Sequence, residues 1–417
     1  MAPPLETFQT DQPGLPDGDS AVFITTMAHA LGTYGASAHK LEDALVTISE
    51  RFGLEGQFFS APTAVFASLK TPTGRPQTTL IRVHPGEVHL ERMVQLDEIL
   101  VDVAEGKVGA AEGTRRIDAA LSTPDRYGVP LTIASFSVTS ACAARFFGGG
   151  VNEILAALVA GLVIGLLLVF ATRGRDLARL IEFLCGFVIS FGAFAWAKFV
   201  MPISPEILML AGLIVLFPGL TLTMAIHELA TRNLSSGTAR MMSAVTVLVS
   251  IGFGVGLGTK LADMAFAGAA PMVSVSSLPQ WSLYLAVAIA PMSLTVLFKA
   301  RLQDMPVLVV SGLIAYVGAR IGAENLGPEL GACVGAGLMG LYSNMYSRVA
   351  RRPSSVPAIV GVMLLVPGSI SFQSVSSFLE HDALGGIETA FATLLVAMSL
   401  VIGFLLSNVA LPPRRAL

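Results

Sequence analysis

Charged residues are scarce in this chain. Asp, Glu, Lys and Arg make up 13% of its 417 residues, and 53% of the residues are hydrophobic. A soluble globular protein carries about twice that share of charge, so the composition indicates a protein that lies largely in a membrane. The net charge of −3 offers no basic surface of the kind that binds nucleic acid, and we expect no nucleic-acid partner.

Cysteine and catalytic motifs are scarce as well. All three cysteines, Cys142, Cys185 and Cys333, lie in apolar runs, where they are more typical of small buried side chains than of disulfides or metal ligands. No serine nucleophile elbow, metal-ligand spacing or phosphate-binding loop accompanies the polar residues of the N-terminal third. The sequence therefore predicts no enzyme, metal or cofactor.

The first twenty residues also lack the basic start and apolar core of a signal peptide, because they are acidic and proline-rich. We expect a disordered tail over residues 1–20 and an N-terminus that stays in the cytosol.

Residues 21–127 are predicted to form a small cytosolic α+β domain, since residues 1–127 hold ten of the 26 Lys and Arg residues. Helical patterns cover 22–35, 37–52, 90–105 and 110–122, and strand patterns cover 58–69 and 78–83. His39, Glu42 and Asp43 lie together at a spacing typical of a solvated helix face. His39, Glu42, Pro62 and Thr63 are candidate surface or turn residues, which favours a regulatory or assembly role. A membrane-tethered hydrolase or sensor remains the alternative.

Ten apolar runs follow, each long enough to cross about 30 Å of hydrocarbon as a helix. They lie near 130–147, 152–172, 179–201, 205–223, 241–262, 280–298, 304–321, 328–346, 355–373 and 387–410. The sequence thus predicts an all-α polytopic membrane protein. We divide it into repeat 1 (128–266), repeat 2 (278–410) and a cytosolic tail (411–417).

Two short motifs recur in these halves at a constant offset. Pro218-Gly219 and Pro367-Gly368 each end an apolar run, and each is followed by a matching glycine, Gly237 or Gly386. The offset is 149 residues in both pairs (367 minus 218, and 386 minus 237). Because each half has five spans, the halves must enter the bilayer in opposite directions, which predicts the 5+5 inverted repeat of secondary transporters.

The positive charges agree with an N-terminus on the cytoplasmic side. Twelve Lys and Arg residues then fall on the inner side: Arg173, Arg175, Arg179, Arg232, Arg240, Lys299, Arg301, Arg348, Arg351, Arg352, Arg414 and Arg415. Only four fall on the outer side: Arg145, Lys198, Lys260 and Arg320. We therefore expect both termini in the cytosol.

Hydroxyl-bearing residues follow both breaks. Backbone groups freed by proline and glycine are tolerated in a membrane only where they line a cavity or are buried in protein. Uncharged donors and acceptors there suit a small zwitterion. The predicted substrate pathway consists of Pro218, Gly219, Thr221, Thr223, Pro367, Gly368, Ser369, Ser371 and Gln373. The alternative is that the breaks only kink each helix for packing, with hydroxyls bonding local carbonyls.

Four polar residues are candidates for coupling or gating. Glu182 and Glu228 qualify because ionisable groups within membrane spans are functional candidates by default. Asn233 and Asp382 follow the two breaks and also fit helix caps or turns. Glu182 can instead pair with Arg179 or Arg175.

The chain resembles the threonine/serine exporter family. The resemblance rests on the segment 35–45, the turn 146–150, the Phe217-Pro218-Gly219 break with Asn233 and Gly237, and the Val366-Pro367-Gly368 echo. It implies ten membrane helices, a cytosolic N-terminal domain and proton-driven export of threonine and serine across a bacterial-type cytoplasmic membrane.

The expected partners are a small amino acid, protons and the lipid bilayer; a homo-oligomer is an open alternative to a single copy of the chain. In some relatives the two halves are separate proteins linked to dicarboxylate export, so a succinate-like exporter is an alternative. Such a substrate should require fixed positive charge, which the breaks lack. A hydrolase role has also been suggested for the N-terminal region of such proteins.

Overall fold

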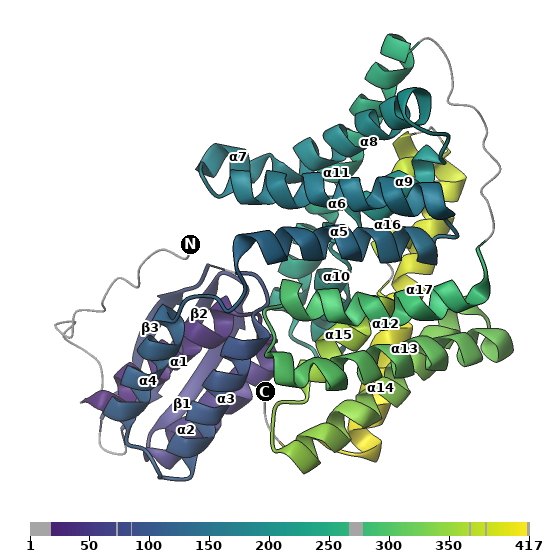
Figure 1. Ribbon diagram of the computed structural model, residues 1–417. Helices are drawn as coiled ribbons and strands as arrows, with labels where there is room; N and C mark the ends of the chain where they lie inside the picture. Colours follow the sequence, from purple (N-terminus) through teal and green to yellow (C-terminus); the bar gives the residue numbers. More distant parts are fainter. Residues whose placement is uncertain are drawn as a thin grey trace.

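The computed structural model describes residues 18–71, 74–84, 86–266, 278–366, 368–379 and 382–414. Over these residues the chain is mostly helical, with one small sheet near its N-terminus (Figure 1). Residues 1–17 of the predicted tail and Pro367 of the second break lie outside the described residues.

Residues 18–127, here called the N-terminal unit, contain four helices and one antiparallel sheet of order β1-β2-β3. The elements are α1 (Asp19–Thr33), α2 (Ala38–Arg51), β1 (Glu55–Ala61), β2 (Ala64–Lys70), β3 (Gln77–Arg82), α3 (Leu90–Ala104) and α4 (Ala110–Ser122). Strand side chains alternate between two faces. Val65, Leu69 and Ile81 are accordingly buried beneath the helices, whereas Phe59, Phe66 and Leu80 are exposed on the other face.

The prediction of one strand over 58–69 is wrong. Pro62 and Thr63 form a two-residue turn, and Ala61 faces Ala64 across an antiparallel hairpin. Proline has no N–H to give to a ladder, so this is where a continuous strand would be weakest.

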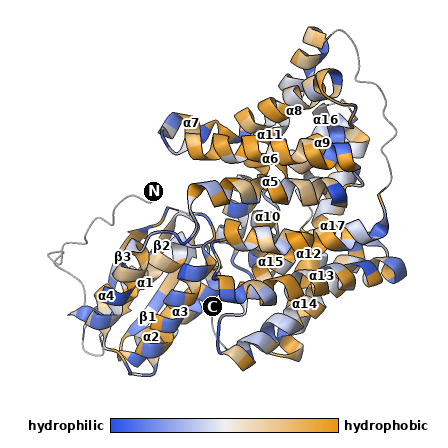
Figure 2. Cartoon of the chain, in the orientation of Figure 1, coloured by the Kyte–Doolittle hydropathy of each residue, from blue (hydrophilic) through white to orange (hydrophobic). Residues whose placement is uncertain are grey.

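The remaining helices carry the apolar runs (Figure 2). They are α5 (Val129–Phe146), α6 (Val151–Ala171), α7 (Arg175–Arg179), α8 (Ile181–Phe199), α9 (Pro205–Leu213), α10 (Gly219–Ala230), α11 (Leu234–Phe266), α12 (Gln280–Leu297), α13 (Met305–Leu326), α14 (Pro328–Ala350), α15 (Ser355–Leu365), α16 (Gly368–Leu379) and α17 (Ala383–Ala410). By length and composition, eight helical stretches of the described residues can cross a membrane. The count of ten stays a prediction.

Both Pro-Gly motifs separate two helices. The run predicted as one span over 205–223 is divided into α9 and α10, with Pro218 outside the helix and Gly219 as the first residue of α10. The run over 355–373 is divided in the same way into α15 and α16, and α16 begins at Gly368. Proline cannot donate a helical hydrogen bond, and α9 has already ended at Leu213 when the chain reaches Pro218.

Long helices pack in pairs through small residues. A Cβ atom added to Gly254 of α11 would collide with the carbonyl oxygen of Phe183 on α8. One added to Gly403 of α17 would collide with the carbonyl oxygen of Cys333 on α14. These glycines therefore allow the backbones to touch.

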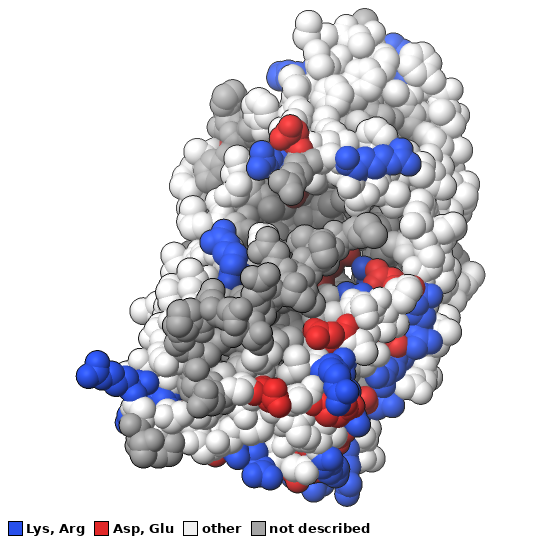
Figure 3. All heavy atoms as spheres, turned by 90° about the vertical axis from the view of Figure 1, so that its left-hand side faces the viewer, with Lys and Arg blue, Asp and Glu red and all other residues white. Residues whose placement is uncertain are grey.

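The N-terminal unit docks on one end of the helical bundle, where α12 is joined to α13. The amide of Leu90 donates to the Phe298 carbonyl over 2.9 Å, and the Tyr127 hydroxyl donates to the Ala300 carbonyl over 2.6 Å. Lys299 forms an ion pair of 2.7 Å with Asp125. Charged side chains are frequent over this unit in Figure 3, which looks onto this end of the molecule.

Candidate functional site

The two breaks meet in space although they lie 149 residues apart in the sequence (367 minus 218). The rings of Phe217 and Phe372 stack with centroids 4.9 Å apart. A Cβ added to Gly219 would overlap the Val366 side chain and would lie 3.3 Å from the Cα of Gly368. The half-helices α10 and α16 thus start beside each other.

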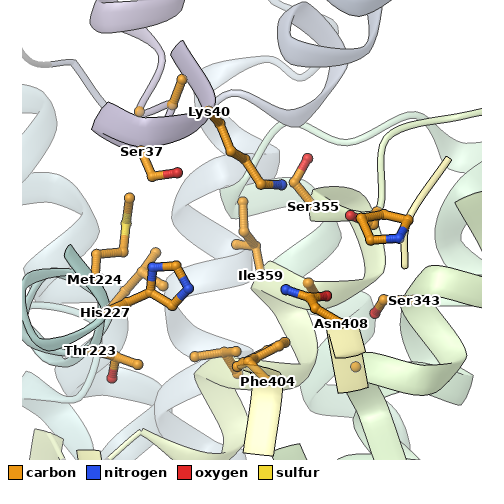
Figure 4. Close-up of a pocket in the computed structure, with 18 of the residues that line it drawn as sticks. Ser37, Lys40, Thr223, Met224, His227, Ser343, Ser355, Ile359, Phe404 and Asn408 are labelled. Atoms are coloured by element: carbon orange, nitrogen blue, oxygen red, sulfur yellow. The ribbon is translucent and has the colours of Figure 1, made fainter. Parts of the chain in front are cut away.

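A cavity of about 180 Å³ lies between this crossing and the N-terminal unit; we call it the domain-side cavity (Figure 4). Side chains from α2, α10, α14, α15 and α17 line it. Its polar lining residues are Ser37, His39, Lys40, Thr223, His227, Ser343, Asn344, Ser354, Ser355 and Asn408, and Met224, Ile359 and Phe404 are among its apolar ones.

A second cavity of about 250 Å³, the distal cavity, lies among α5, α9, α12, α13, α15 and α16. Phe146 and Phe147, at the end of α5 farthest from the N-terminal unit, line it together with Thr139, Tyr316 and Ser369. This cavity is mostly apolar.

An apolar layer formed by Phe217, Leu220, Val366 and Phe372 lies where the two cavities approach each other. Leu220 lines the domain-side cavity and Val366 lines the distal one, and both pack in the same hydrophobic cluster. The stacked rings of Phe217 and Phe372 lie close to the starts of α10 and α16, where Phe217 approaches Gly368 and Val366 approaches Gly219.

The predicted pathway residues are divided between the cavities. Thr223 lines the domain-side cavity and donates to the Gly219 carbonyl over 3.0 Å. Ser369 lines the distal cavity. Ser371 is buried and donates to the Gly368 carbonyl over 2.7 Å. Local bonding of hydroxyls, the alternative interpretation of these residues, thus occurs at Thr223 and Ser371.

Two further pathway residues lie away from both linings. Thr221 is half-buried on α10, and Gln373 is exposed on α16.

The first turn of α2 forms one wall of the domain-side cavity. The rings of His39 and His227 lie with centroids 5.1 Å apart. Burial lowers the pKa of His39 to about 4, so this ring is neutral at neutral pH. Burial also lowers the pKa of the Lys40 ammonium to about 8, while the carboxylate of Asp97 opposes that shift.

The expectation of a solvated face at His39 is therefore wrong. The residues that cover it come from α10, far along the chain, and no local signal in the sequence reports this docking.

Glu228 joins the N-terminal unit to the helical bundle. Its carboxylate is fully buried and accepts hydrogen bonds from the Ala38 amide (3.1 Å), the Ser236 hydroxyl (2.7 Å) and the Arg240 guanidinium (3.1 Å). Ala38 is the first residue of α2, where an anion is favourable because the helix N-terminus has free N–H groups. Glu228 thus fastens α2 to α10 and α11.

The other coupling candidates have local roles. Asp382 caps α17 by accepting from the Gly385 amide over 3.0 Å. The Asn233 amide donates to the Thr231 hydroxyl over 3.2 Å within the turn before α11. Glu182 lies half-buried in the first turn of α8, and Arg179 pairs with Asp176.

Acidification is expected to loosen the docking of α2. His39 has a pKa of about 4 when docked against its usual 6.5, so the undocked state binds more protons between these values. The contribution of His39 to docking is thus fully present above pH 6.5 and is lost as the pH falls towards 4. The Lys40 ammonium disfavours a charge on the His39 ring, the His227 ring lies 5.1 Å away, and the Glu228 carboxylate accepts a hydrogen bond from the adjacent Ala38 amide.

Hydrogen exchange of residues 36–45 at pH 7.5 and pH 5.0, corrected for the intrinsic rate, measures this effect. His39→Gln should show a smaller pH difference than the wild type. Equal protection at both pH values would contradict the prediction.

Comparisons with known proteins agree with the membrane character of the chain. A family model described as "Putative threonine/serine exporter" matches residues 22–262, and one described as "Threonine/Serine exporter, ThrE" matches residues 283–410. No solved structure matches.

Relatives of the chain include fungal membrane proteins. "Pheromone-regulated membrane protein 10" of Saccharomyces cerevisiae is 25% identical over 88% of the chain, and the protein of that name from Candida albicans is likewise 25% identical over 88%. The chain spans 48% and 34% of the length of these two relatives, respectively.

Proposed function

Since the chain belongs to the threonine/serine exporter family, we propose that it is a secondary transporter that exports threonine, serine and similar small hydroxy amino acids in exchange for protons. One observation carries the proposal: two cavities border the crossing of two broken helices, and Leu220 from one lining and Val366 from the other pack against the same hydrophobic cluster. Alternating access requires a central barrier with a chamber on each side.

The proposed architecture is an inverted repeat of five plus five spans, α5 to α11 and α12 to α17. In this scheme α9 with α10 forms one span and α15 with α16 forms another. Two reciprocal contacts support it. Gly254 and Gly403, 149 residues apart (403 minus 254), each bring the last helix of a half against its third span. In addition, α10 packs on α17 and α16 packs on α11.

The proposed orientation places the N-terminal unit, a separate domain over 21–127, and both termini in the cytosol of a cell with a bacterial-type cytoplasmic membrane. The excess of Lys and Arg on the side of this unit supports it. The domain-side cavity then receives substrate from the cytosol, and the distal cavity releases it outside.

In the proposed mechanism the two halves rock about the crossing of the breaks. The apolar layer that includes Leu220 and Val366 opens towards one cavity while the other cavity closes. Thr223 and Ser369 supply one hydroxyl to each cavity and bind the substrate in turn.

Efflux from proteoliposomes loaded with labelled threonine tests the function. An imposed proton gradient should accelerate efflux. Thr223→Val and Ser369→Ala should each lower it about tenfold, the effect of losing roughly 1.4 kcal/mol of hydrogen bonding. Thr246→Val, at an exposed site on α11, is the matched control and should leave it unchanged. Absence of threonine efflux from the wild type, or indifference to the gradient, would reject the proposal.

One observation favours the alternative, a dicarboxylate exporter. Lys40 brings to the domain-side cavity the positive charge that the breaks lack. If succinate competes with labelled threonine more strongly than serine does, the dicarboxylate function is the better one.

A further inference from the structure

The first turn of α2 brings a cation into the domain-side cavity. The Glu228 carboxylate holds the Ala38 amide, which fixes the start of α2 over α10. From the same turn the Lys40 side chain extends into the space bordered by Ser355 and Ile359 of α15 (Figure 4). An ammonium group that is surrounded by protein attracts a carboxylate strongly because little water screens the two charges.

The start of α15 faces the same space. Ser354 and Ser355 line the cavity, and Ser354 precedes the first residue of α15 without a side-chain cap. The Ser355 hydroxyl is buried and has no hydrogen-bond partner among the described residues. In this turn the Val356 amide donates to the Pro353 carbonyl and Pro357 has no N–H, so the unused Ser355 hydroxyl is the group that completes the shell of a carboxylate.

His39 offers an atom that can bind the ammonium group of a zwitterion. His39 Nδ1 is buried and has no hydrogen-bond partner within the part of the chain that the structure describes. In the tautomer with its proton at Nε2, Nδ1 accepts a hydrogen bond. The cavity thus offers a cation, a helix start and an acceptor to one small ligand.

We propose that the domain-side cavity binds the carboxylate of the transported amino acid between the Lys40 ammonium and the first turn of α15. The N-terminal unit then contributes directly to the substrate site. This inference rests on the proposed export function and adds to it a residue that determines recognition.

Calorimetric binding of L-threonine and of L-threonine amide to the full-length protein tests the inference. The amide lacks the anionic carboxylate. A charge-assisted hydrogen bond contributes about 1.5–3 kcal/mol, so Lys40→Gln should weaken threonine binding about 10- to 100-fold and leave binding of the amide unchanged. Lys40→Arg should restore much of the loss. Lys70→Gln, an exposed lysine paired with Glu55, is the matched control and should bind like the wild type.

The dissociation constant of threonine amide divided by that of threonine measures recognition of the carboxylate. A change in this ratio distinguishes a lysine that binds the carboxylate from one that only supports the fold. Equal weakening of threonine and its amide by Lys40→Gln would overturn the inference, because a purely structural lysine affects both ligands alike. Unchanged threonine binding would overturn it too. If Lys40→Gln does not fold, Ser355→Ala is used as the test variant. It must lower the dissociation constant of the amide divided by that of threonine.

Transport separates this inference from the function on which it rests. If the wild type exports threonine and Lys40→Gln does so with an unchanged KM, the carboxylate site fails while the export function stands. If the wild type exports no threonine, the export function itself fails. Tighter binding of succinate than of threonine would overturn the assignment to an amino acid.

Discussion

Glu228→Ala is expected to release α2 from the helical bundle. The substitution leaves the Arg240 guanidinium without its buried partner and the Ala38 amide without its acceptor. Removing one member of a buried ion pair costs about 3–5 kcal/mol, because the other charge remains desolvated. A penalty of this size is enough to undock the start of α2 and to open the domain-side cavity to water.

Hydrogen exchange of residues 36–45 in detergent measures the release. In Glu228→Ala these amides should exchange at least about 100-fold faster, while those of β2 should keep wild-type protection because they belong to the sheet. Glu206→Ala, which removes an exposed carboxylate from the first turn of α9, is the matched control. Wild-type protection of residues 36–45 in Glu228→Ala would show that Glu228 does not hold the unit in place.

The same variant should lose threonine efflux if the N-terminal unit contributes to the substrate site. Undocking removes Lys40 from the cavity, and within the bundle the substitution affects only Glu228 and its partners Ser236 and Arg240. Full efflux from an undocked protein would separate docking from transport.

The sequence predicts the broken helices well because their cause is local. Pro218 followed directly by Gly219 favours the end of one helix and the start of another, and the repeated offset predicts that the second break has the same character. The meeting of the two breaks follows from the inverted-repeat interpretation, and the stacked rings of Phe217 and Phe372 agree with it.

The domain-side cavity, in contrast, cannot be predicted from local sequence patterns. His39 and Lys40 lie on an amphipathic helix whose polar face is typical of a solvated surface, and their neighbour His227 lies 188 residues away (227 minus 39). Glu228 is a candidate from its position in an apolar run, but its partner Arg240 is found only through the turn that reverses the chain after α10. Contacts of this kind depend on tertiary packing, which periodicity does not report.

Gly219→Ala is expected to lower threonine efflux by about 5- to 150-fold. The new methyl group would overlap the Val366 side chain at the apolar layer. Overpacking of a filled site costs about 1–3 kcal/mol, and a conformation penalised by that amount is depopulated by the same 5- to 150-fold. Since transport requires this closed conformation in every cycle, the rate of efflux should fall with its population.

A second substitution identifies the cause. Val366→Ala removes the methyl group that the new side chain meets, so the double variant should regain a substantial part of the lost efflux. Gly192→Ala on α8 is the matched control, because an added Cβ there has no atom within 4 Å. If the double variant stays as slow as Gly219→Ala, the effect comes from the backbone of α10 and not from the layer.

This comparison also tests the crossing of the breaks as the centre of the mechanism. Gly219 and Val366 belong to different halves of the chain, and only a direct contact between the halves makes their substitutions depend on each other. Non-additive effects on efflux would place the rate-limiting barrier at this contact. Additive effects would show that the two halves move without changing the contact between Gly219 and Val366. The two cavities would then not be chambers of one pathway.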